Sequence, residues 1–173
     1  MISKTYRIIF IHQRKCAGTS FKKIFELQDE NKHLLQDGLM DKNWYNEDFA
    51  NYIRNYKKVT VIRNPWDKFV SAWKYLDKTK DLDLKTVLKN LPSNEGDAQQ
   101  RHDFRHITRQ QSDLIFDQND EPVVDYIIRF ENFVSDTKRL LKSIGMEVNQ
   151  IPWVQKTKNK PPYHYREFFY DDE

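Results

Sequence analysis

The chain has 173 residues and a net charge of +3, with 32% charged and 14% aromatic residues. This length predicts one domain over residues 1–173. A charge of +3 argues against a nucleic-acid partner, because a DNA-binding domain carries a dominant basic stripe. The one cysteine excludes a disulfide framework within the chain and a zinc site built on several cysteines.

Hydropathy along the chain argues against a membrane-spanning segment. No run approaches the roughly 18 consecutive apolar residues that a transmembrane helix needs. The N-terminus also lacks the apolar central region of a signal peptide. From these two observations we expect a soluble, cytoplasmic protein.

Strand and helix signals alternate along the chain. Apolar, β-branched runs predict strands, and apolar residues at helical spacing predict helices. The expected strands cover residues 6–11, 59–62, 115–116 and 123–128, with a turn at Asn119-Asp120. The expected helices cover 19–27, 47–56, a stretch that begins near Pro65, 83–91, 133–144 with Gly145 as its C-cap, and a terminal helix or arm at 163–170. Residues 100–111 fit a helix or a loop, and the alternation favours a parallel sheet in a layered α/β fold.

The first candidate anion site follows the first strong strand. The run Ile8–Ile11 leads into a basic turn and then into small residues that precede a helix. Backbone N–H groups converge in such a turn and bind an anion, most often a phosphate. Lys15 precedes the single Gly18 and no lysine follows it, so the nucleoside-triphosphate loop pattern is not met. The alternative is an ordinary turn in which Thr19 or Ser20 caps the helix.

The second candidate anion site follows the strand 59–62. Arg63 comes directly after this strand, and Ser71 falls in the second turn of a helix that begins near Pro65. A guanidinium and a hydroxyl can bind one phosphate together. The alternative is that Arg63 pairs with Asp67 and that Ser71 only packs. Ligands of parallel α/β sheets bind at the carboxyl ends of strands, so one ligand with two phosphates could bridge both sites.

Four segments resemble segments of sulfotransferases, and they follow one another along the chain in the same order as in that family. HQRKCAGTSF is similar to the 5′-phosphosulfate loop, and VIRNPWDKFVSAW is similar to the 3′-phosphate motif. VVDYIIRFENFVSDTKRLLKSIG and YHYREFFYDDE resemble later segments of the carbohydrate, Golgi-like branch. The resemblance implies a three-layer α/β fold, with a central, mostly parallel sheet flanked by helices as in nucleotide kinases and other P-loop-like proteins.

The same resemblance implies an activity. A sulfuryl group would move from 3′-phosphoadenosine-5′-phosphosulfate (PAPS) to an acceptor hydroxyl, leaving 3′,5′-adenosine bisphosphate (PAP), with no metal involved. A carbohydrate hydroxyl is favoured by the branch resembled, while a tyrosine, lipid or small-metabolite hydroxyl stays open.

The resemblance also implies roles for individual residues. Lys15 would stabilise charge on the leaving phosphate and is the implied catalytic cation. The implied donor-binding residues are Arg14, Lys15, Cys16, Ala17, Gly18, Thr19, Ser20, Arg63, Ser71 and Lys158. His33 is the first candidate for the catalytic base, and the alternatives are Asp37, Asp41, His102 and His106. The chain departs from the family pattern at Arg14, where a proline is usual, and at Lys68, where an arginine is common.

Two other functions remain open on the sequence. A nucleotide or phosphate kinase would bind ATP with magnesium, but the chain lacks the Gly-Lys-Ser/Thr of such enzymes. A degenerate, non-catalytic module would keep only the nucleotide site, and it would bind the donor's product without transferring a group.

Overall fold

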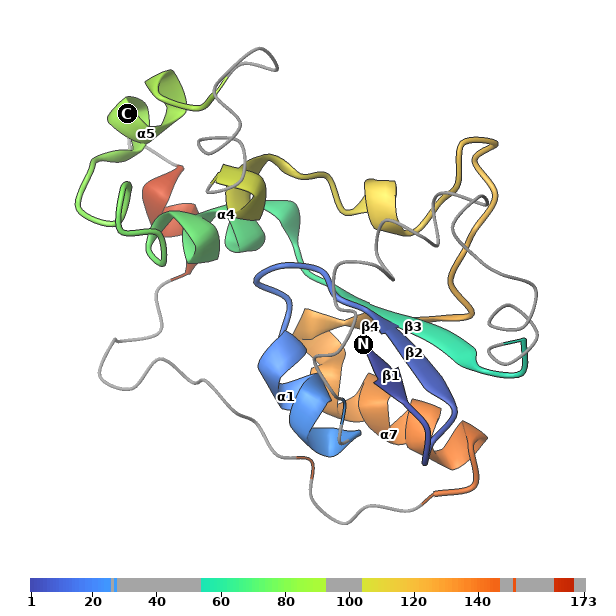
Figure 1. Cartoon of the computed structure of the whole chain (residues 1–173). Coiled ribbons are helices and arrows are strands. Elements are labelled where there is room, and N and C mark those ends of the chain that lie inside the picture. The colour runs from blue at the N-terminus through green and yellow to red at the C-terminus, as the bar shows by residue number, and fades with distance from the viewer. Residues whose placement is uncertain (26, 28–53, 93–103, 147–150, 152–163, 170–173) are drawn as a thin grey trace. The chain divides into compact units, whose positions relative to one another are not determined.

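The computed structural model describes residues 1–25, 27, 54–92, 104–146, 151 and 164–169. The chain divides into two compact units, which we describe separately (Figure 1). Unit 1 comprises Met1–Ile62 and Gln110–Lys156, and unit 2 comprises Arg63–Arg109 and Thr157–Glu173. The expectation of a single domain stays a prediction.

Unit 1 contains a four-stranded sheet in the order β1-β2-β3-β4. Its strands are β1 (Ile2–Ser3), β2 (Ile8–Ile11), β3 (Lys57–Ile62) and β4 (Tyr126–Arg129). Strands β2, β3 and β4 run parallel, whereas β1 is antiparallel to β2. The predicted α/β class with a mostly parallel sheet is confirmed. The prediction missed β1, because two residues are too few to show a strand periodicity.

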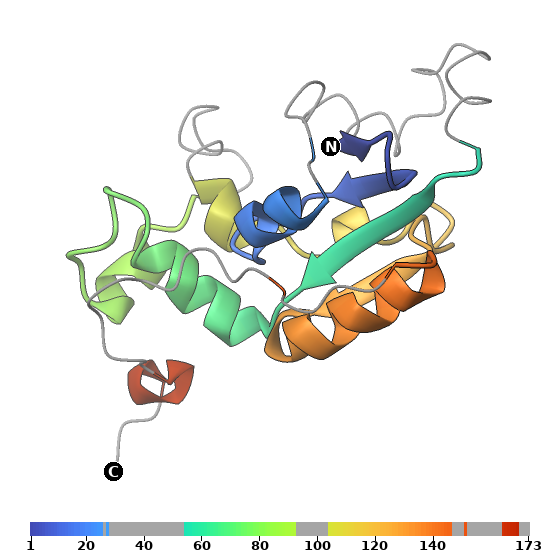
Figure 2. The ribbon, with the colours of Figure 1, turned by 90° about the horizontal axis from the view of Figure 1, so that it is seen from below.

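Two helices of unit 1 cover one face of this sheet: α1 (Gly18–Ile24) and α7 (Phe133–Ser143) (Figures 1 and 2). The strand residues of that face are Ile8, Phe10, Val59, Val61 and Ile128, all buried. Phe10 of β2 stacks on Phe21 of α1 with ring centroids 4.2 Å apart. Aromatic pairs of this kind contribute beyond the area they bury, so the stack fixes the start of α1 beside β2.

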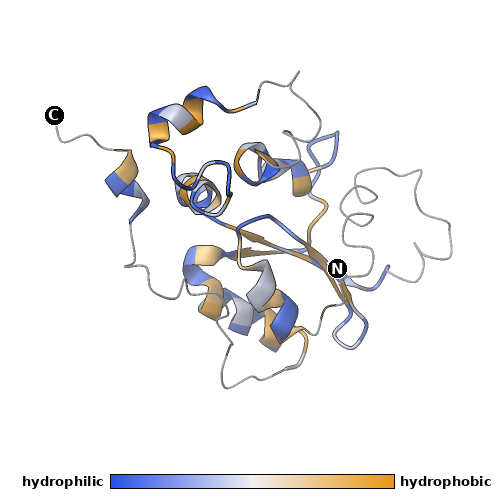
Figure 3. Cartoon of the chain, turned by 60° about the vertical axis from the view of Figure 1, so that its left-hand side comes forward, coloured by the Kyte–Doolittle hydropathy of each residue, from blue (hydrophilic) through white to orange (hydrophobic). Residues whose placement is uncertain are grey.

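Strand β2 is apolar on both faces, whereas β3 and β4 are apolar mainly on the face that packs against α1 and α7. Ile9 and Ile11 point to the face opposite Phe10, yet both are buried as well. Figure 3 colours these central strands as hydrophobic, while the helices carry apolar and polar residues side by side. Strands buried on both faces read as continuous apolar runs rather than as alternating ones. This explains why β2 was visible in the sequence.

Unit 2 is helical around its own small core. It contains α4 (Pro65–Trp73), α5 (Leu84–Lys89), a helical turn at residues 104–108 and the 3₁₀ helix η4 (Tyr165–Phe168). The buried residues of this core are Val70, Ala72, Trp73, Val87, Phe104 and Ile107. Trp73 also meets Phe168 edge to face at 5.3 Å, which attaches η4 to α4.

Most predicted elements are confirmed. These are the strands at β2 and β3 and the helices at α1, α4, α5 and α7, with shifts at their ends. Strand β2 begins at Ile8 rather than at residue 6, and β3 begins at Lys57 rather than at residue 59. Gly145 follows α7 with φ of +76°, the left-handed C-cap conformation that glycine adopts at no steric cost.

The segment before β4 differs from the prediction. Strand β4 begins at Tyr126 rather than at residue 123. The carboxylate of Asp125 accepts the N–H of Lys58 at 2.6 Å, and its own N–H donates to the Lys58 carbonyl at 2.8 Å. The Asp125 side chain therefore replaces a ladder hydrogen bond just before the strand. The short strand expected earlier is reduced to one isolated bridge at Phe116.

Three further predictions have mixed outcomes. In the segment 100–111, residues 104–108 are helical, and the 3₁₀ helix η2 (Ser112–Leu114) follows. Within the terminal helix or arm expected at 163–170, the structure has the 3₁₀ helix η4 (Tyr165–Phe168). The helix expected at 47–56 lies outside the described residues except for 54–56, which are not helical. Among the helices that the structure describes, none is long and apolar enough to cross a membrane.

Candidate functional site

The loop between β2 and α1 has an unusual backbone. Lys15 and Ala17 have φ of 63° and 54°, so two non-glycine residues adopt the left-handed conformation. Each such residue costs about 1–3 kcal/mol and persists only when its surroundings determine it. Turns that include left-handed residues form concave groups of N–H donors, which bind anions. The backbone of this loop is therefore suited to bind a phosphate.

The alternative reading of the loop, in which Thr19 or Ser20 caps α1, does not match the structure. The helix begins at Gly18, its N-cap is Ala17, and no side chain caps it. Thr19 and Ser20 already lie inside the first turn, so neither hydroxyl occupies the N-cap position. Ala17, in the left-handed conformation, occupies the N-cap position instead of a hydroxyl residue. Thr19 is exposed, Lys15 is half-buried, and Ser20 is fully buried.

Gly18 leaves the space that the His12 side chain occupies. A Cβ atom built on Gly18 would lie 2.0 Å from His12 Nε2, well inside van der Waals contact. The imidazole thus covers the start of α1, and it also meets the Phe10 ring at 5.8 Å. His12 therefore packs within the loop, between Phe10 and Gly18.

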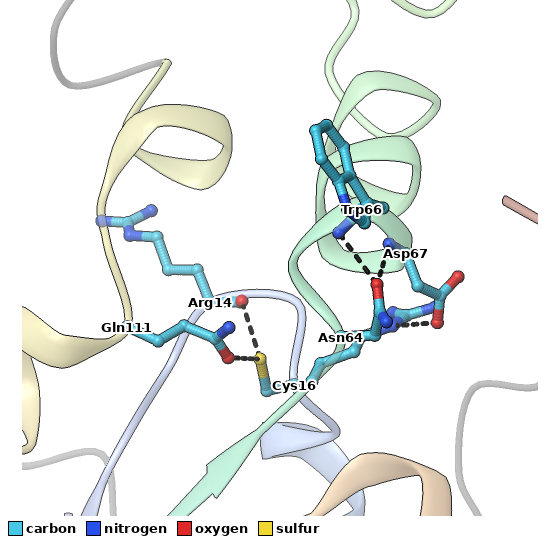
Figure 4. A network of polar contacts seen from close by, with 7 residues as sticks. Arg14, Cys16, Asn64, Trp66, Asp67 and Gln111 are labelled. Carbon is cyan, nitrogen blue, oxygen red and sulfur yellow. Dashed lines mark hydrogen bonds and ion pairs between the residues drawn. The ribbon is translucent and has the colours of Figure 1, made fainter. Parts of the chain in front are cut away.

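A residue far away in the sequence contacts the loop at two points. The Gln13 side chain donates from Nε2 to the carbonyl of Gln111 at 2.8 Å. The Cys16 thiol lies 3.5 Å from Gln111 Oε1 and 3.3 Å from the carbonyl of Arg14 (Figure 4). Gln13 is 2% exposed and Cys16 is fully buried. Sequence reasoning missed Gln111, because nothing near it in the chain marks a contact 95 residues away.

The start of α4 is determined by its own residues. Asn64 is the N-cap, and its Oδ1 accepts the N–H groups of Trp66 and Asp67 at 3.0 and 3.3 Å (Figure 4). Pro65 is the first helical residue, where its fixed φ suits the helix and its missing N–H is not needed. The segment thus folds as a capped helix start directly after the Arg63 backbone.

Arg63 forms an ion pair inside the same motif. Its Nε lies 2.6 Å from Asp67 Oδ2, four residues later, and the two side chains are 12% and 21% exposed. This is the pairing that the sequence offered as the alternative to phosphate binding. A guanidinium carries five N–H donors, and this pair engages the one at Nε. Ser71, the other predicted phosphate ligand, is half-buried in α4.

Lys68 is a buried cation on α4. It is 5% exposed and donates from Nζ to the carbonyl of Arg109 at 2.8 Å. The carbonyl follows directly on the helical residues 104–108, so Lys68 fixes the end of that turn. A lysine at this position, where the family pattern often has arginine, is here a structural residue of unit 2.

The predicted site residues fall into three groups. Unit 1 contains the loop residues from Arg14 to Ser20, and unit 2 contains Arg63 and Ser71. His106 lies in unit 2 and stacks on Tyr75 with ring centroids 5.5 Å apart. The remaining candidates lie outside the described residues: His33, Asp37, Asp41, His102 and Lys158. In the part of the chain that the structure describes, no cluster of three or more His, Cys, Asp or Glu could hold a metal ion.

The family of the whole chain follows from a comparison with models of protein families. Residues 1–169 match the model of the sulfotransferase family. The chain belongs to this family. The match includes both candidate anion motifs, and it makes sulfuryl transfer to a hydroxyl-type acceptor the general activity of this sulfotransferase. No curated protein and no solved structure gives a significant match.

Proposed function

We propose that this sulfotransferase uses PAPS as its donor and a carbohydrate hydroxyl as its acceptor, within a single functional domain. The observation that carries the proposal is the family match over residues 1–169. It spans a loop whose left-handed residues form the kind of backbone that binds phosphate. The carbohydrate class rests on the resemblance of the later segments to the Golgi-like branch.

The loop after β2 is proposed to bind the 5′-phosphosulfate. The backbone N–H groups of residues 17–19 and the Thr19 hydroxyl would donate to the phosphate oxygens, and Arg14, Cys16 and Ser20 complete the loop. Lys15 would place its ammonium beside the bond that breaks. Preorganised donors of this kind stabilise charge as it develops, which is the main way a protein accelerates such a transfer.

The start of α4 is proposed to bind the 3′-phosphate through Arg63 and Ser71. Each hydrogen bond to a charged group contributes about 1.5–3 kcal/mol, so loss of Arg63 should weaken binding roughly tenfold to a hundredfold. Lys158, which lies outside the described residues, is proposed to add a further positive charge to the nucleotide.

The transfer itself is an in-line displacement at sulfur. The acceptor oxygen forms a bond to sulfur while the bond from sulfur to the 5′-phosphate oxygen breaks, and the electron pair stays on the phosphate of PAP. The acceptor proton moves to a base, for which we propose His33, because a neutral imidazole is a common general base in proteins. Asp37, Asp41, His102 and His106 are the alternatives.

Calorimetric titration tests the donor. Purified protein is titrated with PAP, with ATP–magnesium and with AMP, and the same series is run on Arg63→Ala. We expect micromolar binding of PAP that exceeds binding of AMP and falls at least tenfold in Arg63→Ala.

Other outcomes would redirect the assignment. Preference for ATP–magnesium would indicate a kinase and contradict the proposal. Tight PAP binding together with no transfer from PAPS to any sugar, tyrosine, lipid or small-metabolite hydroxyl would indicate a non-catalytic nucleotide-binding module.

A further inference from the structure

The loop between β2 and α1 needs support from outside itself. Lys15 and Ala17 are both left-handed, on either side of Cys16, and neither is a glycine. Backbone of this kind reverts to commoner conformations unless neighbouring groups oppose the change. Another part of the molecule must therefore keep Lys15 and Ala17 in this conformation.

Gln111 contacts the loop on both sides of Lys15. Its backbone carbonyl accepts the Gln13 amide at 2.8 Å, and its side-chain oxygen lies 3.5 Å from the Cys16 thiol. Gln13 and Cys16 are shielded from water, at 2% and 0% exposure. A buried amide that loses its partner is costly, so these contacts oppose any shift of the loop (Figure 4).

Gln111 is itself well anchored in unit 1. It is the N-cap residue of η2 (Ser112–Leu114), and the next apolar residues, Leu114 and Ile115, are 3% and 7% exposed. The carbonyl of Ile115 accepts the N–H of Val123 at 2.8 Å. A change in the loop would therefore have to move a packed segment of the unit.

We propose that Gln111 is the positioning residue of the nucleotide loop. It acts through Gln13 and Cys16 to keep Lys15 and the neighbouring N–H groups in place, and it does not touch the nucleotide. The proposal rests on the proposed function for its effect on nucleotide affinity, while its effect on the loop is independent of any ligand.

Cys16 provides a ligand-independent test, because it is the only cysteine of the chain. The rate of alkylation by iodoacetamide, followed by mass spectrometry, reports how often the loop exposes the thiol. Gln111→Ala removes the side-chain acceptor of the Cys16 thiol, keeps the backbone carbonyl that accepts Gln13, and should raise this rate about tenfold. Gln111→Glu keeps an acceptor at the same distance and should stay within about twofold of the wild type. The neighbouring, exposed Gln110→Ala is the matched control and should leave the rate unchanged.

Nucleotide affinities separate positioning from a general loss of structure. Gln111→Ala should weaken PAP and 5′-AMP about tenfold and leave 3′-AMP within about twofold, because only the 5′-phosphate is proposed to contact the loop. Equal weakening of all three nucleotides would show a merely structural role and overturn the proposal. If Gln111→Ala does not fold, the shorter amide of Gln111→Asn replaces it, with an intermediate effect expected.

The two readouts also distinguish this inference from the proposed function. Unchanged alkylation in a folded Gln111→Ala or Gln111→Asn protein overturns the positioning role, whatever the protein binds. Faster alkylation in a protein whose wild type binds no PAP supports the positioning role and rejects the nucleotide assignment.

Discussion

The two candidate anion motifs keep their shapes in different ways. The loop after β2 depends on Gln111, which contacts Cys16 and Gln13 from 95 and 98 residues away in the sequence. The start of α4 depends on its own residues, since Asn64 caps the helix and Arg63 pairs with Asp67 four positions later. The first motif is supported by contacts with a distant residue, whereas the N-cap and the ion pair at the start of the second are local.

This difference has consequences for substitution. A locally determined motif should tolerate changes elsewhere in the chain and respond only to its own residues. A remotely determined loop should respond to a residue that never touches the ligand.

Lys15→Ala should lower the rate of transfer at saturating PAPS by about a hundredfold or more, as for the loss of one charge-stabilising donor. The measurement is the single-turnover release of PAP with an acceptor that the wild type uses. Lys23→Ala is the matched control, because Lys23 is an exposed lysine on α1. Equal rates in Lys15→Ala and the wild type would show that the Lys15 side chain takes no part in the transfer.

Gly18→Ala should weaken PAP about tenfold, because the added methyl group would lie 2.0 Å from His12 Nε2 and the imidazole must move. A double-mutant cycle with His12→Ala sharpens this prediction. In the His12→Ala background, Gly18→Ala should cost less than about threefold. An undiminished cost there would mean that the glycine is needed for another reason.

Asp67→Asn should change PAP affinity by less than about threefold. Removing the Asp67 carboxylate loses its pair with Arg63 but frees the guanidinium Nε for the phosphate and lessens repulsion of the phosphate, so the two effects oppose each other. Titration calorimetry measures the change, with Asp77→Asn as the control, because Asp77 forms an exposed pair with Lys80. A loss larger than that of Gln111→Ala would reverse the comparison between the two motifs.

Asp136 in α7 allows folding stability to be changed without changing a residue of the candidate site. Burial raises the pKa of Asp136, but the Arg129 N–H at 3.0 Å and the Arg139 guanidinium outweigh burial and keep the pKa below its ordinary value. Its stabilising effect is present above the unfolded pKa of about 3.9 and is lost as the pH falls through the lower, folded value.

Asp136→Asn should therefore lower the unfolding free energy at pH 7 by about 1–2 kcal/mol. This difference from the wild type should shrink as the pH falls below about 4 and through the lower folded-state pKa, as measured by urea unfolding at pH 7 and at a series of acidic pH values. PAP affinity at pH 7 should stay within about twofold of the wild type. A large loss of affinity would show that stability alone can mimic the effects predicted for the loop.

The sequence predicted those parts of the fold that short segments determine. Strands β2 and β3 are apolar, β-branched runs, and Gly145 ends α7 at a left-handed position. Pro65 correctly marked the start of α4. In each case the residues that cause the structure are neighbours in the chain, so the pattern and its cause coincide.

The remaining features depend on contacts that the sequence does not display. The N-cap of α1 is Ala17 rather than Thr19 or Ser20, because Ala17 adopts a left-handed conformation that the sequence does not favour. Strand β1 pairs through two residues, and Gln111 contacts a loop 95 residues away. These features arise from tertiary packing, which overrides local preference where the candidate site is built.

The central claim is that two motifs of this sulfotransferase bind the two phosphates of one nucleotide. The most direct measurement is the affinity of the wild type, Lys15→Ala and Arg63→Ala for 5′-AMP, 3′-AMP and PAP. The account predicts that Lys15→Ala weakens 5′-AMP but not 3′-AMP, that Arg63→Ala does the reverse, and that both weaken PAP. If both variants weakened both monophosphates equally, or if the 3′-phosphate added nothing to affinity, the division of the nucleotide between the two motifs would be contradicted.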